Sequence, residues 1–355
     1  IKGIQAKKNP TGVSPSDFFD PLNQIREGFS QIIDNPEPNR ICIIPSASYG
    51  MGIVARNLQL EPGDNVIVAG DQFPSNVYPW LSLEGPNAVR VTYIPAPKGT
   101  HRGKMWNEQI LDAIDTATKM VTLGHIHWAD GTIFDLKAIR KRTKEVGALL
   151  VVDGTQSIGA LPFSVKNFEP DALIVAGYKC MMGPYSIGCA YFGPYFDEGL
   201  PLEENWKNRK DSHIFSRLVD YQPEYQPGAL RYDVGESSNF ILVPMLLEAI
   251  RQVNAWEPWK IQVYCKHITA APLEALTQMG WEVEGSDQRA SHLFGIRPPM
   301  GLDLLALKAQ LEKEKIFVSV RGDAIRVSPS VYNTEEDLYR LVEACKKVGA
   351  KERVS

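Results

Sequence analysis

Two side chains suited to amine chemistry each follow a short apolar run in this sequence. Residues 148–152 (ALLVV) lead to Asp153, and residues 172–176 (ALIVA) lead through Gly177 and Tyr178 to Lys179. A lysine amine that is neutral often enough attacks an aldehyde and forms a Schiff base. A carboxylate raises the pKa of a cationic ring nitrogen beside it. Together the two residue types predict chemistry on a molecule that carries both an aldehyde and a basic ring.

The two apolar runs also predict where these side chains lie. Short apolar runs bounded by turn residues are typical of strands buried on both faces of a sheet. Ligands of open α/β sheets bind beyond the carboxyl ends of such strands, so Asp153 and Lys179 are expected to meet at one edge. Pyridoxal phosphate needs a lysine for its Schiff base and a carboxylate for its pyridinium nitrogen. We therefore predict a pyridoxal phosphate site with Lys179 and Asp153 as its catalytic residues.

Two longer motifs around these residues carry a family resemblance. The pattern D-x-x-Q starts at Asp153, and the pattern Y-K-x-x-x-G-P-x-x-x-G starts at Tyr178. From about Ile41 to the C-terminus the chain resembles the class V aminotransferase superfamily of fold type I pyridoxal phosphate enzymes. This group includes cysteine desulfurases, kynureninases and isopenicillin N epimerase-like proteins. The resemblance implies an α/β fold with a mostly parallel sheet in the large domain, a smaller α+β C-terminal domain, and a homodimer.

The same resemblance implies which residues contact the cofactor. A strand followed by small residues and a helix start places the phosphate at a helix N-terminus, which favours anions. Core packing remains the alternative for both of the aromatic residues in the set. The implied cofactor-binding residues are Ala47, Ser48 and Tyr49 in the phosphate turn, Phe73 and Trp128 at the ring, Gln156 at the phenolic oxygen, Tyr178 at the phosphate, and Ser237 at the partner subunit's phosphate.

A C-terminal motif points to the substrate. The run R-x-S-x-x-x-Y-N-T begins at Arg326 and resembles the family's carboxylate-clamping segment. A planar guanidinium binds a carboxylate through two hydrogen bonds. His127 stands where the family has a serine and is expected to touch cofactor or substrate. These residues predict a small amino acid or a similar carboxylated amine as the substrate.

Several reactions remain open at such a site. Return of the α-proton to the cofactor gives transamination, return to the opposite face gives epimerisation, and loss of a β-group gives a lyase. We favour transamination, with a lyase or an epimerase as alternatives. Cysteine desulfurases of the family carry a nucleophilic cysteine on a loop shortly before the clamping arginine. Residues 320–325 (VRGDAI) contain no cysteine and leave no room for that loop.

Two other classes of protein compete with this interpretation. Residues 50–55 (GMGIVA) spell G-x-G-x-x-A, and Asp71 follows the next strand, as in nicotinamide oxidoreductases. However, these glycines are expected inside a helix instead of in the turn before it. Fold type I domains also act as non-catalytic ligand sensors, although no helix-turn-helix pattern is present. His125 and His127 alternate on one strand, but two imidazoles alone make a poor metal site.

Composition restricts the partners and the compartment. The net charge of −4 and the lack of a basic stripe argue against nucleic acid. The longest apolar runs are too short to span a membrane, and no secretory leader is visible. Five scattered cysteines show neither zinc-ligand nor disulfide spacing, which predicts a reducing cytoplasm.

Alternating strand and helix patterns predict the domain organisation. We expect an N-terminal arm at residues 1–15, a large cofactor-binding domain at 16–255 and a small domain at 256–355. A long excursion rich in Pro, Tyr and charge occupies residues 199–228. Strands are predicted at 40–44, 65–69, 88–94, 120–126, 148–152 and 172–176, and helices at 16–33, 49–60, 107–117, 136–146, 241–270 and from 334 to about 348.

Overall fold

The structure is a computed structural model that describes residues 2–87, 89–99 and 101–352. It divides into two compact units, which we describe separately. The large unit comprises the described residues up to Pro95 together with Gln109–His125 and Asp135–Pro258. The small unit comprises Ala96–Glu108, Ile126–Phe134 and the described residues from Trp259 onward.

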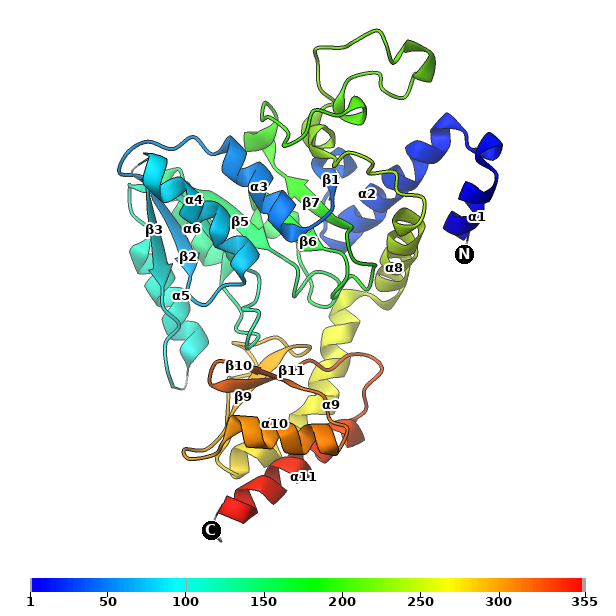
Figure 1. Ribbon diagram of the computed structural model, residues 1–355. Coiled ribbons are helices and arrows are strands. Elements are labelled where there is room, and N and C mark those ends of the chain that lie inside the picture. The colour runs from blue at the N-terminus through cyan, green and yellow to red at the C-terminus, as the bar shows by residue number, and fades with distance from the viewer. Residues whose placement is uncertain (1, 88, 100, 353–355) are drawn as a thin grey trace. The chain divides into compact units, whose positions relative to one another are not determined.

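Seven strands of the described chain form one sheet in the large unit (Figure 1). Their order across the sheet is β1-β7-β6-β5-β4-β2-β3. Strand β7 pairs antiparallel with both β1 and β6, while β6, β5, β4, β2 and β3 run parallel. The prediction of a mostly parallel sheet is confirmed. The strands are β1 (Ile41–Ile44), β2 (Asn65–Ala69), β3 (Arg90–Ile94), β4 (Thr118–Gly124), β5 (Leu149–Asp153), β6 (Ala172–Ala176) and β7 (Gly188–Phe192).

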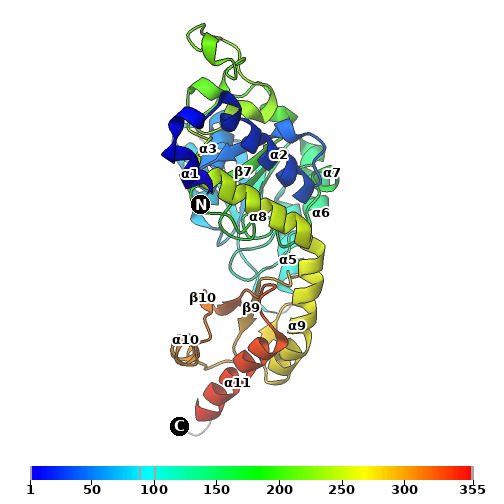
Figure 2. The same cartoon turned by 90° about the vertical axis from the view of Figure 1, so that its right-hand side faces the viewer.

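Helices pack closely onto this sheet and onto one another. A Cβ added at Gly50 of α3 would lie 2.7 Å from a methyl group of Ile174 in β6, so this glycine permits the close contact. Helices α2 and α8 lie side by side (Figure 2). Within the part of the chain that is described, no helix is both long enough and apolar enough to cross a bilayer. The helices of the large unit are α1 (Lys2–Lys8), α2 (Asp20–Ile32), α3 (Ala47–Asn57), α4 (Tyr78–Asn87), α6 (Leu136–Val146), α7 (Val165–Phe168) and α8 (Leu242–Trp256). Helix α5 (Arg102–Ala113) is shared by the two units, and α9 (Pro258–Gln278) belongs to the small unit from Trp259 onward.

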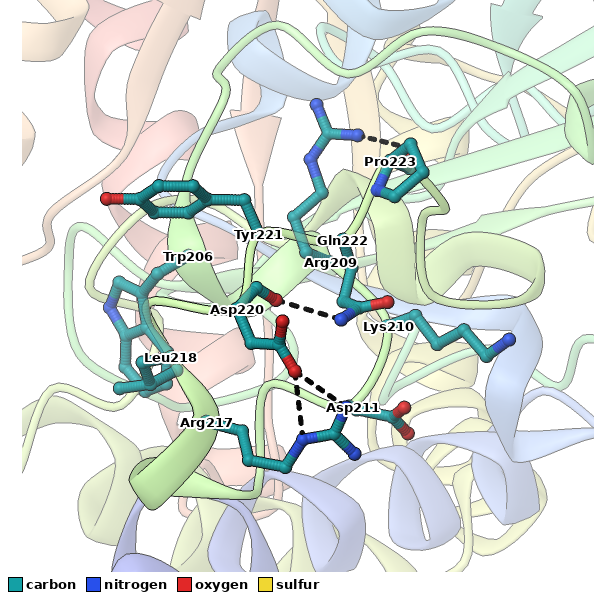
Figure 3. A pocket seen from close by; sticks show the side chains of 10 residues that line it. All are labelled: Trp206, Arg209, Lys210, Asp211, Arg217, Leu218, Asp220, Tyr221, Gln222 and Pro223. Atoms are coloured by element: carbon teal, nitrogen blue, oxygen red, sulfur yellow. Dashed lines mark hydrogen bonds and ion pairs between the residues drawn. The ribbon is translucent and has the colours of Figure 1, made fainter.

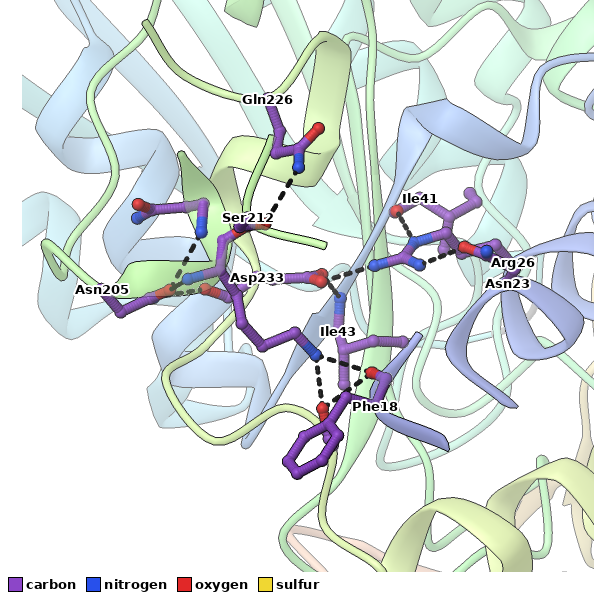
Figure 4. A network of polar contacts seen from close by, with 12 residues as sticks. Phe18, Asn23, Arg26, Ile41, Ile43, Asn205, Ser212, Gln226 and Asp233 are labelled. Carbon is purple, nitrogen blue, oxygen red and sulfur yellow. Dashed lines mark hydrogen bonds and ion pairs between the residues drawn. The ribbon is translucent and has the colours of Figure 1, made fainter. Parts of the chain in front are cut away.

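A buried polar network closes the outer edge of β1 (Figure 4). Asp233 accepts hydrogen bonds from the Arg26 guanidinium and from the backbone N–H of Ile43, and both charged side chains are buried. The Arg26 Nε donates to the carbonyl of Ile41. These contacts satisfy backbone groups that an edge strand would otherwise leave unpaired, and they tie α2 to the sheet.

The small unit contains a second, antiparallel sheet with the order β10-β11-β9-β8. Apolar side chains of β9 and β11 alternate onto one face, where Ile296 and Ile325 are fully buried in a cluster with residues of the helices. Two-residue alternation of this kind is typical of a sheet covered on one face. The elements are β8 (Glu282–Val283), β9 (Phe294–Arg297), β10 (Ser319–Arg321), β11 (Ala324–Val327), α10 (Leu304–Lys313) and α11 (Glu335–Glu352).

Some helices differ from the sequence-based expectation. Helix α3 begins at Ala47, two residues early, because the Ser46 hydroxyl accepts the Tyr49 N–H at 3.2 Å and caps it. Helix α5 begins at Arg102 instead of Asn107. Residues 71–80 were expected in a loop, but α4 begins within them at Tyr78, since Pro79 lies in the first turn, where proline is compatible with a helix.

The N-terminal region also departs from the prediction. Residues 2–8 of the expected N-terminal arm, for which no helix was predicted, form α1. The capping box lies at Ser14, whose N–H donates to Asp17 at 2.7 Å, and it closes a short 3₁₀ turn. Helix α2 therefore starts only at Asp20, four residues after the predicted start at residue 16.

The excursion at residues 199–228 is irregular, as predicted. It contains short 3₁₀ turns, at Trp206–Asn208 and Phe215–Arg217, and a third begins at Gly228. Its base is anchored by aromatic contacts, since the ring of Phe18 lies 5.5 Å from that of Phe215 in an edge-to-face arrangement. Such pairs stabilise beyond simple burial.

Lys207 is a buried cation at this base. Its Nζ donates to the Phe18 carbonyl at 3.0 Å and to the Ser238 hydroxyl at 2.5 Å, and the residue is 5% exposed. Burial lowers the pKa of this ammonium to about 8. An unfolded lysine titrates near pH ~10.4, so between these values the folded chain binds fewer protons than the unfolded chain.

We expect this difference to appear as a pH-dependent stability. Stability rises with pH wherever the unfolded state holds more protons. From pH 7.5 to 9.5 the wild type should therefore gain on the order of 2 kcal/mol in unfolding free energy relative to Lys207→Met. Urea denaturation of both proteins at the two pH values measures this. A difference in unfolding free energy between the two proteins that is the same at both pH values would contradict the lowered pKa of Lys207.

Candidate active site

Asp153 and Lys179 lie at the carboxyl ends of neighbouring strands. Asp153 is the last residue of β5, and Lys179 follows β6 by three residues. The two strands pair in parallel, with Asp153 opposite Ile174. Both residues therefore lie at the carboxyl edge of the parallel strands, where they were expected.

The carboxylate of Asp153 is held by its own turn. Its Oδ1 accepts the N–H of Thr155 at 2.9 Å, while the Thr155 hydroxyl accepts the N–H of Ala176 at 3.1 Å and so joins the ends of β5 and β6. Burial raises the pKa of Asp153, although hydrogen bonds from Thr155 and the charge of Lys179 act in the opposite direction. Because the ionised carboxylate is incompletely compensated, a protonated ring nitrogen beside it would be favoured. This residue therefore fits pyridoxal phosphate.

The backbone around Lys179 is fixed by glycines. The N–H of Gly183 donates to the carbonyl of Gly177 at 2.7 Å, and that of Gly177 donates to Ile187 at 3.0 Å. A Cβ added at Gly177 would lie 2.4 Å from the Ile187 oxygen, and one at Gly159 would lie 2.4 Å from the Cys180 oxygen. Only residues without a side chain permit this close approach, so the turn sets the position of the lysine.

Aromatic rings surround the lysine amine. Its Nζ lies 5.4 Å from the ring centroid of Phe73 and 5.9 Å from that of Tyr178. Tyr178 stacks on Tyr185 with centroids 4.0 Å apart and planes inclined by 13°. Phe73 is 37% exposed, so part of its ring remains open to a ligand.

The predicted phosphate turn lies at the N-terminus of α3. The N–H of Tyr49 is taken by the Ser46 cap, but those of Ala47 and Ser48 precede the first intrahelical bonds and point out of the helix. Ser48 is exposed, and its hydroxyl lies 3.0 Å from that of Ser46. Burial and the neighbouring Glu203 raise the pKa of Tyr49. Backbone N–H groups and Ser48 are the donors that suit an anion here.

The two remaining predicted contacts in the large unit differ in exposure. Gln156 lies partly exposed in the turn after β5. Ser237 is 2% exposed, and its hydroxyl has no hydrogen-bond partner among the described residues. A contact of Ser237 with a phosphate therefore stays a prediction.

The small unit holds the other predicted residues. Arg326 Nη1 donates to the carbonyl of Trp128 at 3.0 Å. His127 is 1% exposed, its Nδ1 lies 3.2 Å from Asp130 Oδ1, and its ring packs on Trp106. The structure thus brings Trp128 and Arg326 together, whereas the contacts of His127 are with the interior of the unit.

A glycine lets the loop that carries Trp128 approach the sheet. Gly295 of β9 lies directly opposite Arg326 of β11. A Cβ added at Gly295 would be 2.8 Å from the Cβ of Asp130. The buried Asp130 occupies that space, and although burial opposes it, the hydrogen bond from His127 and the charges of His127, Arg102 and Arg297 hold its pKa well below the usual value.

The structure does not favour the competing motifs. Gly50 and Gly52 lie within α3, so the turn between β1 and α3 lacks the glycines of a dinucleotide fingerprint. The ring of His125 packs against Phe163 and Phe168 in the large unit. His125 and His127 therefore have separate surroundings, and among the described residues no group of three or more potential ligands could hold a metal.

A cavity of about 530 Å³ lies in the excursion (Figure 3). Two arginines at its wall have local partners. Arg209 donates to the Pro223 carbonyl at 2.7 Å, and Arg217 pairs with Asp220 at 2.7 Å. A third arginine of this region, Arg231, is mostly buried and donates to a backbone carbonyl.

Three residues of the two units were not identified from the sequence. Thr155 joins the ends of β5 and β6, Tyr185 stacks on Tyr178, and Arg321 lies over the ring of Trp128. A threonine two residues after a strand-end aspartate is a local signal for the first. The other two depend on contacts that sequence spacing does not give.

Comparisons with known proteins identify the family. The family model described as Aminotransferase class-V matches residues 14–341. The chain is 25% identical over 331 residues to an uncharacterized aminotransferase, YcbU, of Bacillus subtilis (strain 168), covering 90% of this chain and 81% of that protein. It is 26% identical over 344 residues to a cysteine desulfurase of Pectobacterium atrosepticum, covering 92% and 82%.

Solved structures show the same fold. An apo cysteine desulfurase from Thermococcus onnurineus NA1 aligns with a TM-score of 0.80 at 20% identity, covering 94% of this chain and 85% of that one. A C-DES variant with glycine covalently linked to its PLP cofactor aligns with a TM-score of 0.83 at 18% identity, covering 97% and 90%. Together with the family match and the strand ends described above, these comparisons lead to one conclusion: the chain belongs to the class V aminotransferase family of pyridoxal phosphate-dependent enzymes.

Proposed function

We propose that this enzyme transfers the amino group of an amino acid, or of a similar carboxylated amine, with Lys179 as the catalytic amine. The observation that carries the proposal is the joining of two neighbouring strand ends, with Asp153 at the end of β5 and Lys179 beyond β6. Bound pyridoxal phosphate supplies an aldehyde that captures the substrate amine and a ring that accepts electrons from the α-carbon.

Each of the residues has a separate task in this proposal. Asp153 keeps a proton on the ring nitrogen, so that the ring can accept charge. Lys179 Nζ removes the α-proton as a general base and returns it as a general acid. Arg326 binds the α-carboxylate bidentately and so sets which bond of the α-carbon faces the ring. Phe73 packs on the ring face, and the first turn of α3 binds the phosphate.

The remaining predicted contacts complete the proposed site. Gln156 and Tyr178 would donate hydrogen bonds to the cofactor, and Trp128 would pack beside its ring. His127, whose ring contacts Asp130, would act on the substrate only through the loop that carries Trp128. We also propose a homodimer, in which Ser237 approaches the phosphate bound by the partner. Sedimentation equilibrium measures the oligomeric state.

The hairpin before Arg326 supports transfer over desulfuration. Strands β10 and β11 are joined by the two residues Gly322 and Asp323, and Arg321 pairs with Ala324 directly across the turn. Such a tight turn carries neither a cysteine nor a flexible loop that could bring one to the substrate. A desulfurase reaction that needs a cysteine on this loop is therefore disfavoured.

A screen of L- and D-amino acids tests the proposal. We expect at least one of them to change the visible absorption of the cofactor-loaded enzyme and to yield one equivalent of keto acid per active site without a second substrate. Mass spectrometry identifies the products. Ammonia released together with an α-keto acid over many turnovers would instead establish a lyase, and interconversion of enantiomers an epimerase. A spectrum that no amino acid alters would favour a sensor.

A further inference from the structure

One face of the small-unit sheet carries three arginines. In the register of β9, β10 and β11, Arg326 lies opposite Gly295 and Arg321 lies opposite Ala324. Residues directly opposite each other on antiparallel strands share a face, and side chains two residues apart return to it. Arg297, two residues after Gly295, therefore shares a face with Arg321 and Arg326.

Carboxylates already neutralise Arg297. Its Nη2 donates to Asp130 Oδ2 at 3.0 Å, and its Nε donates to Asp323 Oδ1 at 3.1 Å. Asp130 is 4% exposed and also pairs with Arg102 at 3.1 Å. Both carboxylates therefore already pair with guanidinium groups other than that of Arg321.

Arg321 has a different environment. Its guanidinium carbon lies 5.3 Å from the ring centroid of Trp128, and its Nη1 donates to the Val320 carbonyl at 2.9 Å. Within the described ranges no carboxylate lies at ion-pair distance from Arg321, and its Nε is buried without a hydrogen-bond partner. A guanidinium with a buried, unsatisfied donor is costly unless an anion meets it.

Arg321 and Arg326 converge on one residue. Arg326 donates to the Trp128 carbonyl at 3.0 Å, while Arg321 lies over the Trp128 ring. Diagonal residues on antiparallel strands stand about 7–8 Å apart, within reach of long side chains. Two guanidinium groups in this arrangement suit a molecule that carries two carboxylates.

We infer that Arg321 binds the side-chain carboxylate of the substrate and that the enzyme selects acidic amino acids of the aspartate and glutamate class. The inference rests on the proposed function, in which Arg326 holds the α-carboxylate. The planar fork of Arg321 can donate two parallel hydrogen bonds to a second carboxylate. The ion pairs of Arg297 hold the Trp128 loop and the β10–β11 hairpin in the positions that this contact needs.

Binding of simple carboxylates tests the inference without turnover. Isothermal titration of the cofactor-loaded protein compares glutarate with valerate, and succinate with butyrate. At least one dicarboxylate should bind about tenfold or more tightly than the monocarboxylate of equal chain length, the effect of one charge-assisted contact. Arg321→Gln should abolish this preference and Arg321→Lys should keep part of it. Arg340→Gln, an exposed arginine of α11 in the same unit, should leave both affinities unchanged.

Two results would overturn the inference. The first is equal affinity of the wild type for mono- and dicarboxylates. The second is an equal loss of both affinities in Arg321→Gln, which would indicate that Arg321 only supports Trp128.

Initial rates with L-glutamate against L-glutamine, and with L-aspartate against L-asparagine, separate this inference from the proposed function. Arg321→Gln should lower kcat/KM for the acids alone, whereas Arg326→Gln should lower it for acids and amides alike. The wild type could prefer dicarboxylates, and lose that preference in Arg321→Gln, while no amino acid changes the visible absorption of the loaded enzyme. That result would support the Arg321 site and contradict amino-group transfer. Turnover of amino acids without a dicarboxylate preference would do the reverse.

Discussion

The Lys179→Ala enzyme is expected to retain no more than about one thousandth of the wild-type kcat, a loss within the range for removing a general acid–base group. The turn built on Gly177 and Gly183 places this amine beside the aromatic rings of Phe73 and Tyr178. The amino acid identified by the screen serves as the substrate. Keto acid formed per enzyme per second gives kcat, and the visible absorption of the loaded protein should also change.

Lys179→Arg is the matched control for this result. It keeps a positive charge beside the ring of Phe73, but a guanidinium stays protonated and cannot act as a base. Its kcat should therefore fall as far as that of Lys179→Ala, while the melting temperature of the cofactor-free protein stays close to the wild-type value. Substantial turnover by either variant would exclude Lys179 as the proton-transfer group.

Asp153→Asn is expected to lower kcat by about 10²–10³-fold, as does removal of a group that stabilises developing charge. An asparagine oxygen can still accept the N–H of Thr155, so the turn is preserved. What is lost is the negative charge that keeps the ring nitrogen protonated. Asp171→Asn is a suitable control, because Asp171 pairs with Arg140 before β6 begins and should affect stability without lowering kcat.

Although Asp153→Asn should lower kcat, it should raise the thermal stability of the cofactor-free protein. The pKa of Asp153 is raised in the fold by burial. Such a group contributes stability only below its unfolded pKa and loses it as the pH rises through the folded value. At pH 7 the carboxylate is therefore unfavourable without the cofactor, and Asp153→Asn should melt at a higher temperature than the wild type. With cofactor bound the order should reverse, and thermal melts in both states test this.

The strands, and the positions of Asp153 and Lys179 beyond their carboxyl ends, could be predicted because their signals are local. Strands β2 and β6 and helix α6 have the predicted bounds, since an unbroken apolar run or a capped amphipathic pattern is complete within a few residues. Asp153 and Lys179 follow such runs directly. The antiparallel strand β7 was not identified, because nothing in the residues 188–192 indicates its direction or its partners.

The surroundings of Arg326 could not be predicted, because they depend on long-range packing. The ion pair between Asp130 and Arg297 joins residues 167 positions apart. The contact of Arg321 with Trp128 arises from strand register and from the missing side chain of Gly295. Sequence spacing indicates neither of these contacts. For the same reason, the domain boundary expected near residue 255 did not show that residues 96–108 and 126–134 group with the C-terminal part.

That grouping has a consequence for biosynthesis. The chain passes between the two units after residues 95, 108, 125, 134 and 258. A fragment that starts at residue 259 would lack Asp130, and the space beside Gly295 that this residue fills would stand open. During translation the segments 96–108 and 126–134 leave the ribosome long before the strands they pack against. A fragment that begins at residue 259 would therefore have to fold without two segments of its own unit.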